Sequence, residues 1–134
     1  MNRTELLTLS GYTEEDLIVV DDALSLVKGH GAMLSFVHNQ TEDICISAVK
    51  HDGMALAYVK NKTDAIINAA LKENPDSLQF LTASEQTEPR CLLAVNLDGS
   101  SLRYVHNKTV VVCDAAVTNK ASAIVYVDMS LYPA

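Results

Sequence analysis

Cysteine and histidine carry the most versatile chemistry in this chain, which has three of the former and four of the latter among its 134 residues. A thiolate acts as a nucleophile or metal ligand, and an imidazole as a general base or metal ligand. Cys45, Cys91 and Cys113 share the fifth position of a repeated segment, where other copies have Ala23 and Ile67. These residue types share apolar packing, and no Cys-x-x-Cys pair is present. We therefore predict three reduced thiols in a core, with no metal or redox role.

The histidines make a weaker case for catalysis or metal binding. His38 and His106 lie three copies apart, about 30 Å at the usual helix-packing distance, so they cannot share a metal ion. His30 and His51 come from adjacent copies and can approach each other beside Asp52, which leaves open an enzyme with an unrecognised site. No third ligand and no catalytic motif accompany them. We expect exposed turn histidines, no catalytic residue, no metal and no cofactor.

Internal repeats must position all of these side chains. The segments 45–63 and 91–109 match at more than half of their positions without a gap. Such self-similarity at a fixed period is typical of repeat architectures. The same frame gives five copies, and positions are counted from the first residue of each: 19–40, 41–62, 63–86, 87–108 and 109–130.

Apolar residues within each copy recur at intervals of three and four, which indicates helix rather than strand. Gly31, Gly53 or Pro75 separates two such stripes, as expected where one helix ends and another begins. Each copy therefore predicts two helices of about eleven and eight residues, at helical period. The fold class is all-α, an α-solenoid of five 22-residue helix-turn-helix repeats in one domain over 1–134, with a leucine-rich repeat as the weaker alternative.

Smaller features complete this expectation. The copies open on a threonine followed by acidic residues, which predicts helix caps. Before the repeats, we expect one helix over about Thr4–Leu9 and another start at Thr13. The apolar tail 129–134 either folds back as a cap or leaves an open end through which a homodimer could form. The aromatic row at position eighteen is expected in the core: Phe36, Tyr58, Phe80, Tyr104 and Tyr126.

A family resemblance follows from the second copy. The segment 41–59 has the pattern Thr-x-x-x-Cys-x-x-Ala-Val-Lys-x-x-Gly-x-Ala-Leu-x-Tyr-Val. This pattern resembles the short tandem repeat called domain of unknown function 4116, found in bacterial and viral proteins, and 87–95 is similar to its helix opening. The chain departs from the pattern at Val19, Ile67 and Pro75. The resemblance implies a helical repeat architecture and no assigned activity.

Charge restricts the partners. The chain has 10 Lys and Arg against 17 Asp and Glu, a net charge of −7, which argues against direct nucleic-acid binding. The acidic residues gather near the N-terminus, where a patch for a basic partner competes with an ordinary solvated face. Lysines at position ten complement the helix dipole and would form a ladder along one edge of a stack. The candidate partner-binding residues are Glu14, Glu15, Asp16, Asp21, Asp22, Lys28, Lys50, Lys72, His38, Lys60 and His106.

The sequence thus predicts a small acidic protein-binding repeat module that is not an enzyme. Short apolar runs exclude a membrane span, and Met1–Leu9 lacks a signal-peptide pattern, so we expect a cytoplasmic protein. Specificity would reside at the positions that vary between copies, namely 3, 6, 7, 14, 17 and 20. The alternative is a phage- or mobile-element-encoded inhibitor that occludes a nucleic-acid-binding protein, in the manner of an anti-CRISPR.

Overall fold

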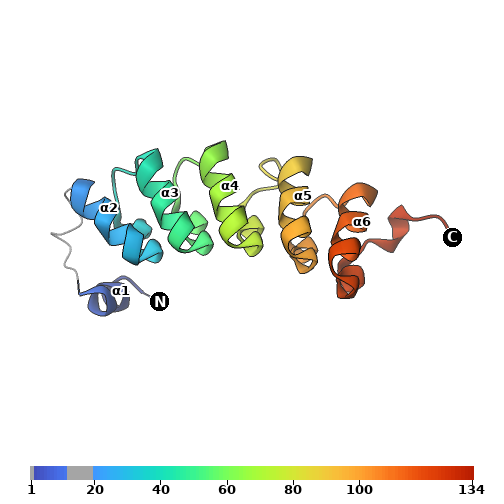
Figure 1. Ribbon diagram of the computed structural model, residues 1–134, viewed down its shortest axis with the longest axis horizontal. Helices are drawn as coiled ribbons and strands as arrows, with labels where there is room; N and C mark the ends of the chain where they lie inside the picture. The colour runs from blue at the N-terminus through green and yellow to red at the C-terminus, as the bar shows by residue number, and fades with distance from the viewer. Residues whose placement is uncertain (1, 12–19) are drawn as a thin grey trace. The chain divides into compact units, whose positions relative to one another are not determined.

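The computed structural model describes residues 2–11 and 20–134, and this part of the chain is helical without any strand (Figure 1). The all-α class is therefore confirmed. The helix expected near the N-terminus is present as α1, Arg3–Ser10. The helix start expected at Thr13 lies outside the described residues. Among the described residues, no helix combines the length and apolar character needed to cross a membrane.

One local pattern recurs through the rest of the described chain. An α-helix of 10 residues is followed, after a single linking residue, by a 3-10 helix of 6 residues. A last short 3-10 helix, η7, spans Met129–Leu131. The pairs are α2 Val20–Gly29 with η2 Gly31–Phe36, α3 Glu42–His51 with η3 Gly53–Tyr58, α4 Asp64–Glu73 with η4 Pro75–Phe80, α5 Glu88–Leu97 with η5 Gly99–Tyr104, and α6 Val110–Asn119 with η6 Ala121–Tyr126.

The second element of each copy is shorter and tighter than the sequence led us to expect. In η3, Gly53 and Leu56 are buried, and Val59 is buried directly after the helix. These residues are three apart, which is the period of a 3-10 helix, and Ala55 is buried beside that row. Asp52 starts the turn, because its carboxylate accepts a hydrogen bond from the Met54 amide at 3.0 Å. Asn74 and Asp98 do the same in their copies.

Threonine caps start most of the α-helices, as predicted. The hydroxyls of Thr41, Thr63 and Thr109 accept hydrogen bonds from the amide three residues later, at 3.3 to 3.4 Å. Thr87 precedes α5 without a side-chain cap bond, so the prediction fails at that copy. Acidic side chains in the first turn, such as Glu42 and Asp43 of α3, favour the positive end of the helix dipole.

The chain divides into two compact units, 1–73 and 74–134. In the first unit α2 packs on α3 and α3 on α4, while η2 contacts α3 and η3 contacts α4. In the second unit α5 packs on α6, and η5 contacts both α6 and η6. Each unit has its own apolar core, in which Val49 and Leu56 of the first and Val95 and Leu102 of the second are fully buried.

The aromatic row at position eighteen is not uniformly in the core, contrary to expectation. Phe36 is 6% exposed, whereas Tyr58 is 41% exposed. Phe80, Tyr104 and Tyr126 are half-buried. Position eighteen therefore lies at the margin of the core, where burial differs from copy to copy.

Close backbone approach explains the glycine that opens the 3-10 helices. A Cβ atom added to Gly31 would lie 2.6 Å from the Ala48 carbonyl oxygen of the next copy, and one added to Gly99 would lie 2.2 Å from that of Ala116. Contacts below about 3 Å force the backbone apart, since neither atom belongs to a flexible side chain. The glycines therefore allow the 3-10 helix of one copy to touch the α-helix of the next.

Substitution of these glycines tests the close approach. We expect Gly31→Ala to lower the free energy of unfolding by about 1–3 kcal/mol, the usual cost of overpacking. Gly29→Ala is the matched control, because nothing lies within 4 Å of its added Cβ atom. Since alanine is the better helix former by about 1 kcal/mol, this control should be neutral or stabilising. Urea unfolding curves that shift equally for both variants would contradict the interpretation.

Candidate functional site

The acidic residues proposed for partner binding fall largely outside the described structure. Glu14, Glu15 and Asp16 lie outside the described residues. Asp21 and Asp22 lie in the first part of α2, and their side chains are not described. The acidic patch therefore stays a prediction.

The lysines at position ten form a consistent set within the first unit. Lys28, Lys50 and Lys72 are each one residue from the C-terminal end of α2, α3 or α4, and each is exposed. These three helices pack side by side. Among the described residues no hydrogen bond or ion pair engages any of the three ammonium groups. The arrangement matches the expected ladder, with the charges at the negative ends of the helix dipoles.

The residues at position twenty are exposed but do not form a site together. The Lys60 ammonium donates to the His38 carbonyl oxygen at 3.3 Å, so these two are neighbours in the first unit. His106 belongs to the second unit, where its backbone amide donates to the Gln86 side chain at 2.9 Å. Both imidazoles are at the surface.

The residues considered for an enzyme site are His30, His51 and Asp52, and two of them, His51 and Asp52, are engaged by backbone amides. The His51 Nδ1 atom accepts a hydrogen bond from the Gly31 amide at 3.1 Å, which joins two copies. Glu73 accepts from the Gly53 amide in the same way. In the second unit the Asn119 amide oxygen accepts from the Gly99 amide at 2.7 Å. Imidazole, carboxylate and amide thus fill one structural role, which requires an acceptor and makes no use of imidazole acid–base chemistry.

The third copy lacks this hydrogen bond, and the residues that replace its donor and acceptor support the interpretation. Its 3-10 helix begins with Pro75, which has no backbone N–H to donate. The matching acceptor position in the next copy is Leu97, an apolar and half-exposed residue. Pro75 offers no amide hydrogen, and the residue at the matching position, Leu97, has no side-chain acceptor.

The three cysteines are buried, as predicted for core packing. Burial raises the pKa of the Cys45 and Cys91 thiols above the ordinary value, and the nearby Glu42 and Glu88 carboxylates raise it further. A raised pKa keeps these sulfur atoms protonated near neutral pH, so they are poor nucleophiles and poor metal ligands.

Sequence reasoning missed a glutamine that joins successive copies. In the first unit, the Gln40 amide nitrogen donates to the Leu34 and Tyr58 carbonyl oxygens at 3.2 and 2.9 Å. Its oxygen accepts from the Lys60 amide at 2.9 Å and from the Cys45 sulfur at 3.6 Å. One side chain therefore satisfies backbone groups of two 3-10 helices and the chain that follows the second.

The second unit has the same arrangement around Gln86. Its nitrogen donates to the Leu78 and Tyr104 carbonyl oxygens at 3.1 and 2.8 Å, and its oxygen accepts from the His106 amide at 2.9 Å. The Cys91 sulfur lies 3.9 Å from that oxygen. The signal in the sequence was a glutamine just before the capping threonine and five residues before a cysteine, which occurs in two copies.

An apolar hollow of about 160 Å³ lies on the second unit, beside the last 3-10 helix. The Tyr132 hydroxyl donates to the Asp114 carboxylate at 2.6 Å, which ties the end of the chain to α6. The tail therefore folds back, one of the two alternatives left open by the sequence. The lining residues are Asp114, Val117, Ile124, Val127, Met129 and Tyr132.

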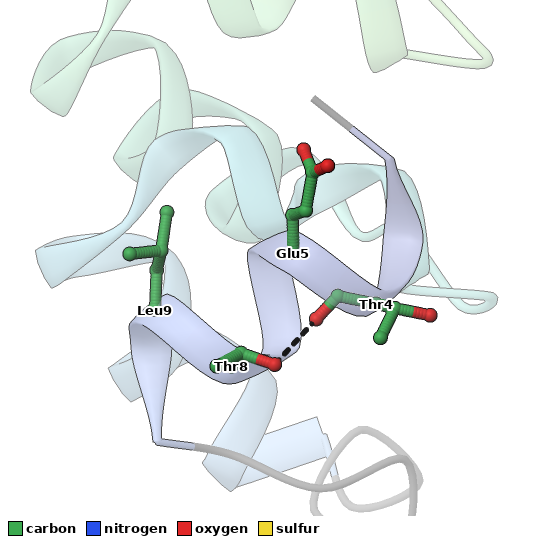
Figure 2. Close-up of a pocket in the computed structure, with 4 residues that line it drawn as sticks. All are labelled: Thr4, Glu5, Thr8 and Leu9. Carbon is green, nitrogen blue, oxygen red and sulfur yellow. Dashed lines mark hydrogen bonds between the residues drawn. The ribbon is translucent and has the colours of Figure 1, made fainter.

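A second hollow, of about 340 Å³, lies along α1 (Figure 2). The described residues that line it are Thr4, Glu5, Thr8 and Leu9, all from one helix. The Thr8 hydroxyl donates to the Thr4 carbonyl oxygen of its own helix at 2.8 Å. This arrangement is an exposed face of a helix with no convergent polar groups, so it indicates no chemistry.

Neither metal ligation nor a known relative points to another site. Within residues 2–11 and 20–134, no group of three or more His, Cys, Asp or Glu side chains is placed to hold a metal ion. Comparison with known proteins gave no matching family model, no matching curated protein and no matching solved structure. The function must therefore be inferred from the geometry of this chain.

The glutamine contact generates one stability prediction. Gln86→Leu removes the partners of two carbonyl oxygens and one amide, so we expect the free energy of unfolding to fall by about 2–4 kcal/mol. Gln79→Leu is the control, because Gln79 is exposed and makes a single bond, to the Asp76 carbonyl oxygen at 3.0 Å. That variant should change stability by less than about 0.5 kcal/mol. Similar losses in urea unfolding for both would refute the role of Gln86.

The tail contact generates a prediction for pH. The hydrogen bond to Asp114 raises the pKa of Tyr132 from 10.0 to about 12. Because the bond requires a protonated phenol, its contribution to stability is complete below the unfolded-state pKa of 10 and is lost as pH rises through about 12. Ultraviolet titration should show a tyrosinate that forms late, near pH 12. Asp114→Ala should return it to the ordinary range, whereas Asp128→Ala should not.

Proposed function

We propose that the five copies form one α-solenoid and that this protein acts by binding another protein, without catalytic activity of its own. The observation that supports the proposal is that some positions of the repeat join neighbouring copies, whereas others are exposed to solvent. Polar side chains that face a neighbouring copy, such as Gln40, His51 and Asn119, are occupied by backbone hydrogen bonds. Side chains at other positions are exposed and change from copy to copy.

Only some of the positions that we expected to set specificity are fully exposed. Positions 3, 17 and 20 are exposed in every described copy, whereas positions 6, 7 and 14 are mostly half-buried. A surface that varies on a constant scaffold is how solenoids present an extended binding face. The residues at position seventeen are Ser35, Ala57, Gln79, Arg103 and Val125.

Apolar surface supports contact with a protein rather than with nucleic acid. Ile124 and Val125 of η6 are 50% and 75% exposed, and Met129 is 62% exposed. Position sixteen, which Ile124 occupies, is fully buried at Leu56 and Leu102. Exposed apolar side chains that lie close together mark interaction sites more often than chance. This end is also where a homodimer would form.

The inhibitor of a basic nucleic-acid-binding protein remains the second proposal, and it rests on the acidic residues 14–22 and the net charge of −7. The similarity to domain of unknown function 4116 supports the helical repeat and adds no activity. A cytoplasmic location is likewise proposed, from the reduced, buried cysteines.

Affinity capture of tagged protein from its source cells, followed by mass spectrometry, tests the function. Washes at about 0.1 and 1 M salt separate the two modes, because the Debye length falls from about 10 to 3 Å. A basic partner lost at high salt would favour the inhibitor, and a partner retained at both would favour the apolar end.

The captured partner is then purified and titrated against surface variants. We expect at least one of Ala57→Arg, Gln79→Arg and Arg103→Glu to weaken binding about tenfold or more, with the melting temperature unchanged, as for an interface hot spot. Absence of any partner at either salt concentration would contradict the proposed function.

A further inference from the structure

We propose that the row formed by Lys28, Lys50 and Lys72, hereafter the lysine row, binds an extended acidic segment with a carboxylate at every third residue. This inference rests on the proposed binding function and names the partner chemistry for one face of the first unit. The lysine row is exposed, and no described side chain pairs with it. At the same position the second unit has Asn96 and Thr118 instead.

The neighbouring acceptors do not neutralise the lysine row by direct pairing. The Glu73 carboxylate accepts a hydrogen bond from the Gly53 amide, and the Asp52 carboxylate accepts one from the Met54 amide at 3.0 Å. The His51 Nδ1 atom is engaged by the Gly31 amide at 3.1 Å. The side chains closest in sequence to the lysines are therefore held by backbone donors, and the ammonium groups keep their donors for a partner.

Apart from Glu73, the acidic side chains of these helices lie at the opposite end. Glu42 and Asp43 occupy the first turn of α3, and Asp64 occupies that of α4. A helix of 10 residues is about 15 Å long, which exceeds the Debye length of about 8 Å at physiological salt. The first-turn carboxylates are thus screened from the lysine row, and the carboxylates that lie near the row, Asp52 and Glu73, accept hydrogen bonds from backbone amides.

Spacing selects the conformation of the partner. Figure 1 shows α2, α3 and α4 side by side with similar orientation, so equivalent positions are one helix-packing distance apart, about 8–10 Å. A polyproline II helix advances about 9 Å in each turn of three residues. Side chains at i, i+3 and i+6 of such a segment therefore point the same way at the spacing of the lysine row. A β-strand would place alternate members of that series on opposite sides.

A labelled peptide of four Glu-Pro-Pro units tests this fit by fluorescence anisotropy at about 0.15 M salt, where charges beyond about 8 Å are screened. The comparison peptide has the same composition with its four glutamates consecutive. We expect the spaced peptide to bind more tightly. We also expect K28Q/K50Q/K72Q to weaken its binding about tenfold, as befits three exposed ion pairs.

K62Q/K108Q/K120Q is the matched control, because it has the same net charge and changes lysines outside the row. It should alter affinity by less than about twofold, since it leaves the lysine row intact. Circular dichroism melts establish that both variants fold.

Equal losses in the two triple variants, tighter binding of the clustered peptide, or no binding of either peptide would each overturn the proposal. Preference for a single-stranded oligonucleotide over the spaced peptide would also overturn it. A cellular partner captured equally well by K28Q/K50Q/K72Q would leave the proposed function in place while removing the lysine row from it.

Discussion

A 3-10 helix of six residues leaves the amides of its first turn and the carbonyls of its last turn without a partner inside the helix, and the rest of this structure depends on how they are paired. The amides at the start of the helix and the carbonyls at its end are paired with different side chains. The first amide of η2, η3 or η5 donates to a side chain at the end of the next α-helix, and the later carbonyls of η2 and η4 accept from Gln40 and Gln86. The amide bonds run between copies, and each glutamine also donates to a carbonyl of the next copy, at Tyr58 or Tyr104, so a neighbouring copy helps to stabilise the short helix.

The same requirement accounts for the glycine and for the core. An amide can reach the next copy only if the backbones approach closely, and at Gly31 and Gly99 there is no room for a Cβ atom. Once the backbones are that close, the rows around Val49 and Leu56 exclude water completely. Burial of this apolar surface then stabilises an element that would be marginal alone. Polar pairing and apolar packing therefore favour the same spacing between copies.

The helical class, most threonine caps and the buried cysteines could be predicted because each leaves a periodic or local signal. The 3-10 geometry could not be separated from an α-helix, since spacings of three and four coexist in the second half of each copy. Gln40 was overlooked for a different reason: its four partners lie five to twenty residues away along the chain, and no local rule connects them. The position shared by His51, Glu73 and Asn119 was obscured by its chemistry, because only the acceptor atom is common to the three.

That last position bears on how function should be inferred for repeat proteins. A histidine beside an aspartate invites a catalytic interpretation, yet the equivalent residues in other copies show what the position does. Glutamate and asparagine accept the same amide hydrogen, and Leu97 appears where Pro75 offers none. Internal copies thus act as natural substitutions within one molecule, and they separate residues that hold copies together from residues that face outward. By this criterion the lysine row belongs to the outward set, because its ammonium groups join no copy to the next and its identity changes between the two units.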